Sequence, residues 1–252
     1  LNRINKAIGY SQSFQFHRAF NLYDKLIKNN YNLNIKDSFP YFGKFYNQYG
    51  VTFTINNNLQ FDLICLNIVK ESIYENENYQ KAISISDANI QAILKKEAQA
   101  IDNFQKDVRK ELMKASPVDV AILVHINEID SSHIKVLKEK LEAQKIVTKI
   151  AVVDFTKINK EKIIELNQII SMAKHLVIYS KAPTTLNDTM FRNTWMSYFQ
   201  DDEIQAKPED HISIFANVGD ELNDLPIKDL PQFNLDELDK LANHVSNHLT
   251  FP

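Results

Sequence analysis

Val118-Asp-Val-Ala-Ile-Leu-Val-His-Ile126 is the most continuously apolar and β-branched stretch of the chain. It follows Pro117, a residue that ends helices, and its length suits a strand. Runs of this kind are typical of strands buried on both faces, at the centre of a parallel sheet that helices cover. The stretch therefore predicts an α/β domain in the second half of the chain.

Strands and helices are expected to alternate after this strand. Further strands are expected at 149–154, 175–179 and 211–218, and amphipathic helices at 131–144, 160–173, 191–203 and 236–249. Repeated strand–helix units with short connections predict a parallel sheet with right-handed crossovers. Ligands of such sheets bind beyond the carboxyl ends of the strands. The loops that we expect to carry a site are 127–132, 155–160 and 180–188.

The first half is expected to be a helical module. Aromatic and aliphatic side chains recur at helical spacing within 13–29, and aromatic residues form a second apolar face that ends at Gly50. This pair is similar to a tetratricopeptide-like helical pair, although no second copy follows at a fixed period. The segments 51–55 and 61–66 fit either a hairpin or helix. A long helix over 87–114 then leads into the second half, so we expect domains at 1–115 and 116–252.

Composition excludes several classes of protein. Charged residues make up 24% and hydrophobic residues 44% of the 252, and the net charge of −3 gives no electrostatic footprint for nucleic acid. The aromatic residues of 39–53 are interleaved with a single basic residue, Lys44, so core packing is favoured over base stacking. The four glycines are scattered, which excludes a glycine-rich phosphate loop. No apolar run approaches the ~20 residues of a membrane span.

Cysteine usage and the start of the chain bear on location. The single cysteine, Cys65, excludes an internal disulfide, lies in an apolar context and fits a reducing environment. No signal peptide opens the sequence. We therefore expect a cytoplasmic protein. Because the chain begins at Leu1 rather than Met, we also expect that an upstream segment was removed or omitted.

The order of several short motifs resembles a bacterial Toll/interleukin-1 receptor (TIR) domain, which has a flavodoxin-like parallel sheet. The resemblance rests on the order and spacing of these motifs. In the second half they are Asp119-Val120, Glu128-Ile-Asp130, the run 169–180, Trp195-Met196 and Asp224-Leu-Pro226. The first half resembles the helical segment that precedes this domain in one group of bacterial TIR proteins, through residues 77–83, Glu97-Ala98 and Ile101-Asp102.

The resemblance implies an activity, but the residue at the catalytic position argues against it. Enzymatic TIR domains hydrolyse NAD, and their glutamate follows the tryptophan by four positions, where a carboxylate can stabilise an oxocarbenium-like state. Here that position is Phe199, which cannot play this role. Glu203 lies one helical turn further, ~5 Å away. It is a weak substitute, and a solvated helix end explains it more simply.

Other candidate residues follow the first predicted strand. Asn127, Glu128 and Asp130 occupy a strand end where a ligand could rest, and Glu128 is the best remaining carboxylate. We add Trp195 as a ligand-binding candidate from the resemblance. Acidic loop residues are more often simply solvated.

Two further features are weighed for metal binding and assembly. His244 and His248 have the i, i+4 spacing of metal ligands but lack a third ligand, so no metal site is expected. The loop 155–160, where TIR domains often carry an assembly loop, lacks glycine. It fits a plain connection at least as well as an assembly contact.

The sequence therefore predicts a helical module followed by a degenerate TIR-like domain. We expect a protein–protein interaction or regulatory module, acting on a protein partner or by self-association, without NAD hydrolase activity and without a bound cofactor. One alternative is an NAD-hydrolysing effector, with NAD as substrate. The other is a nucleotide-sensing module that binds NAD or a related ligand without cleaving it.

Overall fold

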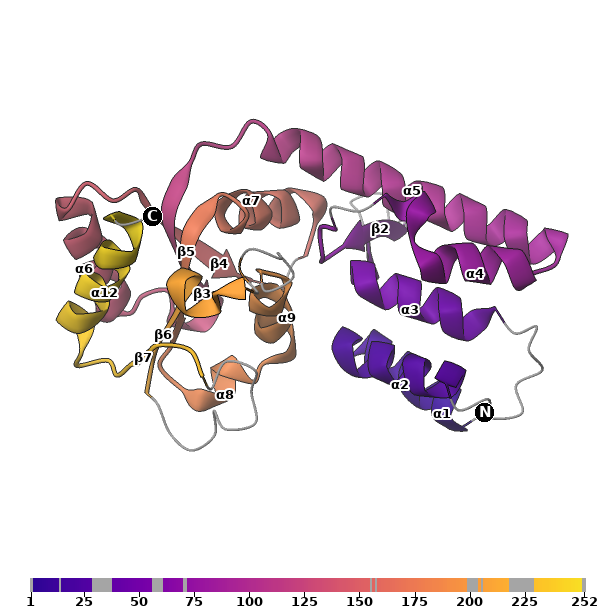
Figure 1. Cartoon of the computed structure of the whole chain (residues 1–252), viewed down its shortest axis with the longest axis horizontal. Coiled ribbons are helices and arrows are strands. Elements are labelled where there is room, and N and C mark those ends of the chain that lie inside the picture. The colour runs from indigo at the N-terminus through magenta and orange to yellow at the C-terminus, as the bar shows by residue number, and fades with distance from the viewer. Residues whose placement is uncertain are drawn as a thin grey trace. The chain divides into compact units, whose positions relative to one another are not determined.

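A computed structural model describes residues 2–13, 15–28, 38–55, 61–69, 72–154, 156, 158–198, 204, 206–217 and 229–250. By its internal contacts the chain forms two compact units, Leu1–Lys110 and Glu111–Pro252. Figure 1 shows the elements of each unit. The boundary expected from the sequence, between 115 and 116, lies in the segment that follows the long helix of the first unit.

The first unit is mainly helical. Tyr23 on its second helix lies against Gly43 on the third, where a Cβ would come within 2.6 Å of the Tyr23 ring. The absence of a side chain at Gly43 therefore permits the close approach of these two helices. The helices are α1 (Asn2–Gln12), α2 (Phe16–Lys28), α3 (Phe39–Tyr49), α4 (Glu77–Ile85) and α5 (Ala88–Leu112), with a 3₁₀ turn η1 (Ile73–Glu75) before α4.

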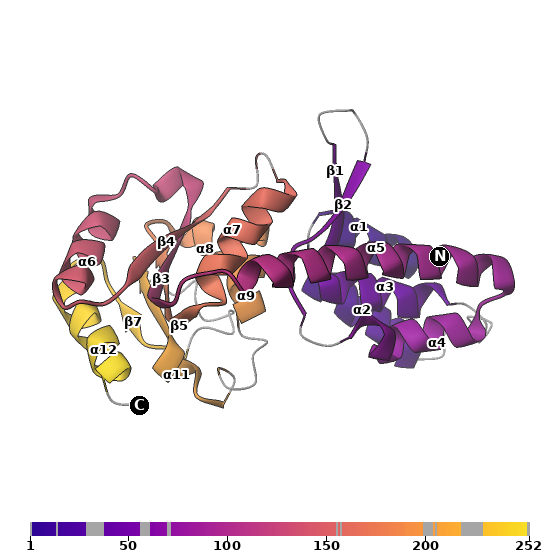
Figure 2. The ribbon, with the colours of Figure 1, turned by 90° about the horizontal axis from the view of Figure 1, so that it is seen from above.

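A hairpin interrupts the helices of the first unit. Gly50 ends α3 with φ 57°, the left-handed conformation that favours glycine, as its position predicted. Strands β1 (Val51–Ile55) and β2 (Phe61–Cys65) then pair antiparallel. Figure 2 shows them projecting from the helices of this unit. Of the two alternatives left open by the sequence, the hairpin is the one that forms.

Polar side chains of α5 form hydrogen bonds with the backbone of the segment that follows β2. Gln105 is fully buried and bonds the backbone at both Asn67 (2.9 Å) and Val69 (3.1 Å). Arg109 donates to the carbonyl of Val69 at 2.9 Å. Buried backbone groups need hydrogen-bond partners, and the segment after β2 has left the sheet. These side chains therefore supply the hydrogen bonds that a neighbouring strand would otherwise provide.

The second unit is an α/β domain built on one described parallel sheet of five strands. Its strands are β3 (Val118–His125), β4 (Thr148–Val153), β5 (Ala173–Ser180), β6 (Ile212–Ala216) and β7 (Gln232–Phe233), in the spatial order β4-β3-β5-β6-β7. The expected parallel sheet is confirmed. Numbered within the unit, the order is 2-1-3-4-5, which is flavodoxin-like.

The opening stretch is the central strand, as its composition predicted. Val120, Ile122 and Val124 face one helical layer, and Ala121 and Leu123 face the other. The first layer consists of α6 (Ser132–Ala143) and α12 (Leu238–Thr250), which lie side by side in Figure 1. The second consists of α7 (Lys160–Ile170), α8 (Pro183–Leu186) and α9 (Thr189–Tyr198).

Short elements were not foreseen. Strand β7 has two residues, Gln232 and Phe233, too few for an alternating pattern to be read from the sequence. Helices α8 and α11 (Pro208–His211) are single turns that begin with proline. Among the helices within the described ranges, none combines the length and apolarity that crossing a bilayer requires.

Candidate functional site

The reversal of strand order places the candidate site between β3 and β5. The chain passes from β3 to β4 on one side of the sheet and then to β5 on the other, so the loops that follow β3 and β5 diverge at this point. A crevice beyond the carboxyl ends of these strands is where flavodoxin-like domains bind ligands. The loop after β3 carries Asn127, Glu128 and Asp130, all three predicted as site residues.

Glu128 bridges the two loops at this switch point. It lies in the 3₁₀ turn η2 (Ile126–Glu128), directly after β3. One carboxylate oxygen accepts from the backbone N–H of Lys181 (3.0 Å), and the other accepts from the N–H of Ala182 (3.3 Å) and the hydroxyl of Thr185 (2.9 Å). Both oxygens are thus engaged in charge-assisted hydrogen bonds with the loop after β5.

Two polar residues fix the same loop from other sides. The hydroxyl of Ser180, a fully buried residue at the end of β5, donates to the carbonyl of Ala182 at 2.6 Å. Asn217, just after β6, donates through its side chain to the carbonyl of Lys181 at 2.8 Å and through its backbone to Ser180 at 3.3 Å. The loop after β5 is therefore held by three neighbouring segments.

The other predicted residues are not gathered around Glu128. Asn127 and Asp130 are exposed, and Asp130 makes no hydrogen bond or ion pair with the part of the chain that the structure describes. Trp195 on α9 is fully buried in the core beneath the sheet, where a ligand has no access to it. Phe199 and Glu203, on which the prediction about hydrolysis depends, lie outside the described residues.

A second set of polar groups lies at the carboxyl end of β4. Asp154 accepts from the ammonium of Lys162 (2.8 Å) through one oxygen, and from the backbone N–H (3.0 Å) and hydroxyl (2.6 Å) of Thr156 through the other. The hydrogen bond from Lys162, followed by those from Thr156, holds the pKa of Asp154 well below its usual range. Asp154 is therefore ionised at neutral pH and anchors the start of α7.

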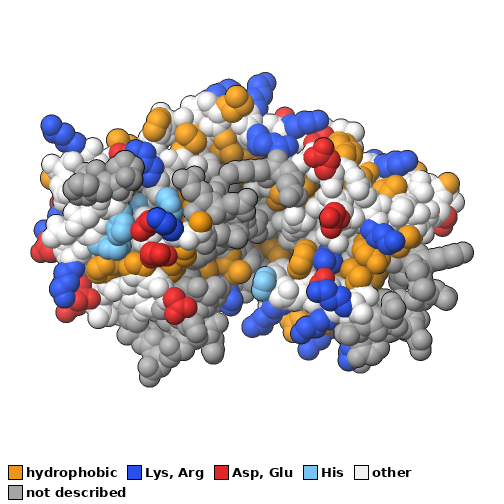
Figure 3. Space-filling model, in the orientation of Figure 1, with side chains coloured by type: hydrophobic (Ala, Val, Ile, Leu, Met, Phe, Trp, Pro, Cys, Tyr) orange, Lys and Arg blue, Asp and Glu red, His pale blue; other side chains and the backbone are white. Residues whose placement is uncertain are grey.

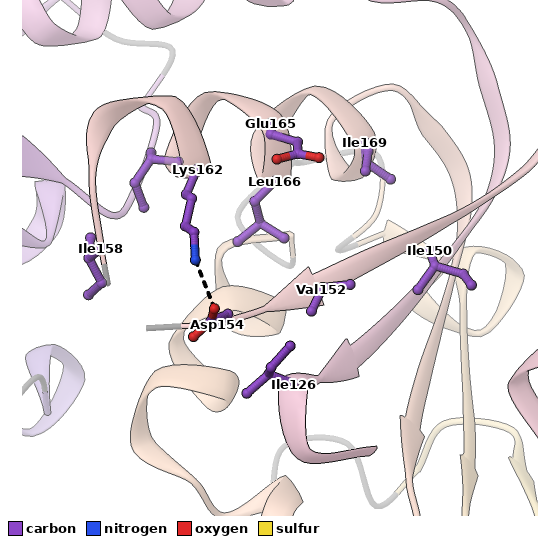
Figure 4. Close-up of a pocket in the computed structure, with 10 residues that line it drawn as sticks. Ile126, Ile150, Val152, Asp154, Ile158, Lys162, Glu165, Leu166 and Ile169 are labelled. Atoms are coloured by element: carbon purple, nitrogen blue, oxygen red, sulfur yellow. Dashed lines mark hydrogen bonds and ion pairs between the residues drawn. The ribbon is translucent and has the colours of Figure 1, made fainter. Parts of the chain in front are cut away.

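Beside this ion pair lies a pocket that sequence reasoning missed. It has a volume of about 160 Å³ and opens between the edge strand β4 and α7. Figure 4 shows the Asp154–Lys162 pair between Ile158 on one side and the aliphatic side chains of β4 and α7 on the other, with Glu165 on α7. The lining residues are Ile126, Ile150, Val152, Asp154, Ile158, Lys162, Ile163, Glu165, Leu166 and Ile169.

The aliphatic residues of this pocket carried a partial signal in the sequence. Ile150, Val152 and Ile158 are half-buried, although a strand and its connection in a covered sheet would bury such side chains completely. The pattern fits a strand at the edge of the sheet, but the strand order was not available from local periodicity. The sequence therefore shows that β4 is apolar, but it does not show that β4 lies at the edge of the sheet with a pocket beside it.

Metal ligands are not assembled in this part of the molecule. Over the residues that the structure describes, no group of three His, Cys, Asp or Glu side chains has the geometry to hold a metal ion. His244 and His248, spaced as a ligand pair, have ring centroids 4.4 Å apart, and Phe233 and His175 lie against them in place of a third ligand.

The strand order and the divergent loops define a flavodoxin-like α/β domain whose switch point is bridged by its own carboxylate. Comparison of the chain with models of protein families, with curated proteins and with solved structures finds no match.

Proposed function

We propose that this protein is a recognition module with a TIR-like second unit, and that it binds a protein partner or a second copy of itself without hydrolysing NAD. The observation that carries the proposal is the engagement of Glu128. The backbone N–H groups of Lys181 and Ala182 are donors of the kind that bind phosphate groups at a switch point. Glu128 already occupies them, so an anionic ligand must displace a carboxylate that belongs to the fold.

Pocket size also favours a side chain over a dinucleotide. Sites for drug-sized ligands and cofactors measure roughly 300–1,000 Å³, whereas an apolar cavity of about 150 Å³ holds benzene. The pocket between β4 and α7 measures about 160 Å³. It can therefore accept one apolar side chain of a partner.

The charges at the rim suggest which partner fits. Asp154 and Lys162 neutralise one another, whereas Glu165 is exposed and makes no ion pair with any residue that the structure describes. A partner that presents an aliphatic side chain beside a basic one would fill the pocket and pair with Glu165. Such a rim charge would contribute to orientation and association rate more than to affinity.

Two measurements test this proposal. A photo-crosslinking residue in place of Ile169, which lines the pocket, is expected to capture a protein in cells. The same residue in place of Val136, an exposed apolar position on α6, serves as the matched control. Mass spectrometry of the crosslinked product distinguishes a second copy from a different protein. Equal crosslinking at the two positions would contradict recognition through the pocket.

The competing function is tested with the purified full chain. We expect no nicotinamide release from NAD. We also expect no rise in melting temperature with NAD or cyclic ADP-ribose. A ligand that binds only the folded state must raise the melting temperature, so this measurement would detect binding. Nicotinamide release that Glu128→Ala or Glu203→Ala abolishes would establish the hydrolase instead. A thermal shift without turnover would establish the nucleotide sensor.

A further inference from the structure

Four histidines gather where the amino ends of β5 and β6 meet α12. His175 belongs to β5, His211 ends α11, and His244 and His248 lie one turn apart on α12. Figure 3 shows histidine side chains grouped over the region of α12 on the face drawn. Neither the switch point nor the pocket beside β4 uses these residues.

His175 is held in one neutral form. It is fully buried, with Nδ1 at 3.0 Å from the carbonyl oxygen of Asp210 and Nε2 at 2.9 Å from the hydroxyl of Ser213. Because a carbonyl only accepts, Nδ1 carries the proton and Nε2 accepts from Ser213. Burial of the ring disfavours a second proton and lowers the pKa of His175.

His244 and His248 share a single carboxylate. Nδ1 of His248 lies 3.4 Å from Oδ1 of Asp210. Nε2 of His244 is buried without a hydrogen-bond partner within the described chain, and its ring lies 4.4 Å from that of His248 and 5.2 Å from that of Phe233. One proton on His248 thus meets an opposite charge, whereas a second proton on His244 meets a like charge.

Among the residues that the structure describes, the acid paired with this cluster is Asp210. Helix α6, which also packs against α12, pairs its Lys140 with Asp239 at 2.6 Å. From α11 the rings face Asp210 and His211, and the Nδ1 of His211 contacts the carbonyl of Lys174 at 3.1 Å. The ammonium of Lys174 on β5 is paired with Asp119 at 2.8 Å. The residues that β6 and β7 place against the cluster are uncharged: Ser213 and Phe233.

We propose that acid releases the C-terminal end of α12 from the amino ends of β5 and β6. When both His244 and His248 carry a second proton, two imidazolium rings lie in contact beside one carboxylate, that of Asp210, and the rings separate. The remainder of α12 stays on the sheet through Leu241, Ala242 and Val245, which are buried in the core.

The expected size of the effect follows from linkage. Burial, and then the neighbouring His248, lower the pKa of His244 in the closed form. A freed histidine titrates near its ordinary value of 6.5. If the closed form binds no proton at His244 and the released form does, the equilibrium constant for release rises by up to about 30-fold at pH 5. At pH 7.5 it is almost unchanged.

Hydrogen–deuterium exchange of the full chain at pH 7.5 and pH 5, corrected for the intrinsic rate, tests the proposal. Amides near the C-terminal end of α12 are expected to lose protection several-fold, up to about 30-fold, at pH 5, and to remain less protected there than those of β3, which exchange only when the whole unit unfolds. His244→Gln is expected to abolish this response and His248→Gln to weaken it, so either variant that folds provides the test.

His17→Gln is the matched control, since His17 lies on α2 of the other unit. It is expected to leave the response of α12 unchanged. Protection of α12 that does not depend on pH would overturn the proposal. So would an unchanged response in His244→Gln, or equal protection of the α12 and β3 amides at pH 5, which would mean that α12 opens only by global unfolding.

Discussion

The carboxylate of Glu128 accepts a 3.0 Å hydrogen bond from the backbone N–H of Lys181, 53 residues further along the chain. This bond joins the ends of two neighbouring parallel strands at the point where the strand order reverses. A carboxylate in this position stabilises the loop after β5 and occupies donors that a ligand would otherwise use.

Glu128→Ala is expected to lower the free energy of unfolding by about 2 kcal/mol, because it leaves two backbone N–H groups and the hydroxyl of Thr185 without their acceptor. Glu128→Gln, which keeps one oxygen, should lower it less. Urea denaturation measures both. Asp130→Ala, in the same loop but exposed, should change the value by less than about 0.5 kcal/mol. Equal effects of Glu128→Ala and Asp130→Ala would show that Glu128 does not stabilise the loop after β5.

Two glycines should respond in opposite directions to the same substitution. A Cβ at Gly43 would lie 2.6–2.9 Å from the ring of the buried Tyr23, so Gly43→Ala should destabilise the first unit by about 1–3 kcal/mol through overpacking. A Cβ at Gly9 meets nothing within 4 Å inside helix α1, so Gly9→Ala should stabilise it by about 0.5–1 kcal/mol. Thermal unfolding followed by circular dichroism distinguishes them. A stabilising Gly43→Ala would show that α2 and α3 do not approach this closely.

Cys65 is expected to be inert in the folded protein. It is fully buried, and burial raises the pKa of its thiol from 9.0 to about 12. At neutral pH this lowers the fraction of reactive thiolate roughly 1,000-fold. Labelling with a chromogenic disulfide reagent should be negligible without denaturant and complete in urea. Rapid labelling of the native chain would mean that β2 opens readily.

Acid should weaken the second unit through His175. Burial lowers the pKa of His175 from 6.5 to about 3, so between these values the unfolded chain binds a proton that the folded chain does not. Above pH 6.5 the titration of His175 does not reduce the free energy of unfolding. Between pH 6.5 and pH 3 the free energy of unfolding falls as the pH falls. At pH 5 the loss amounts to about 2 kcal/mol. Urea unfolding at pH 7 and pH 5 measures this loss, and His175→Gln should show a smaller difference between the two. An unchanged difference in that variant would assign the acid sensitivity to other groups.

The stretch 118–126 and its periodic neighbours determined the alternation of strand and helix, and with it the parallel sheet. Spacing also determined the end of α3 at Gly50 and the long helix α5, because helix and strand periods are local properties of the chain. The hairpin of β1 and β2 was left open, since short apolar runs suit either state. Strand β7 was missed because two residues carry no period.

The tertiary structure decided what those elements bring together. Only the strand order places Glu128 beside Lys181, leaves β4 at the edge of the sheet with a pocket beside it, and carries His175 to the end of α12. The physical reason is that such contacts join residues far apart in sequence. They depend on which strands pair and in what register, and local patterns of hydrophobicity do not encode that pairing.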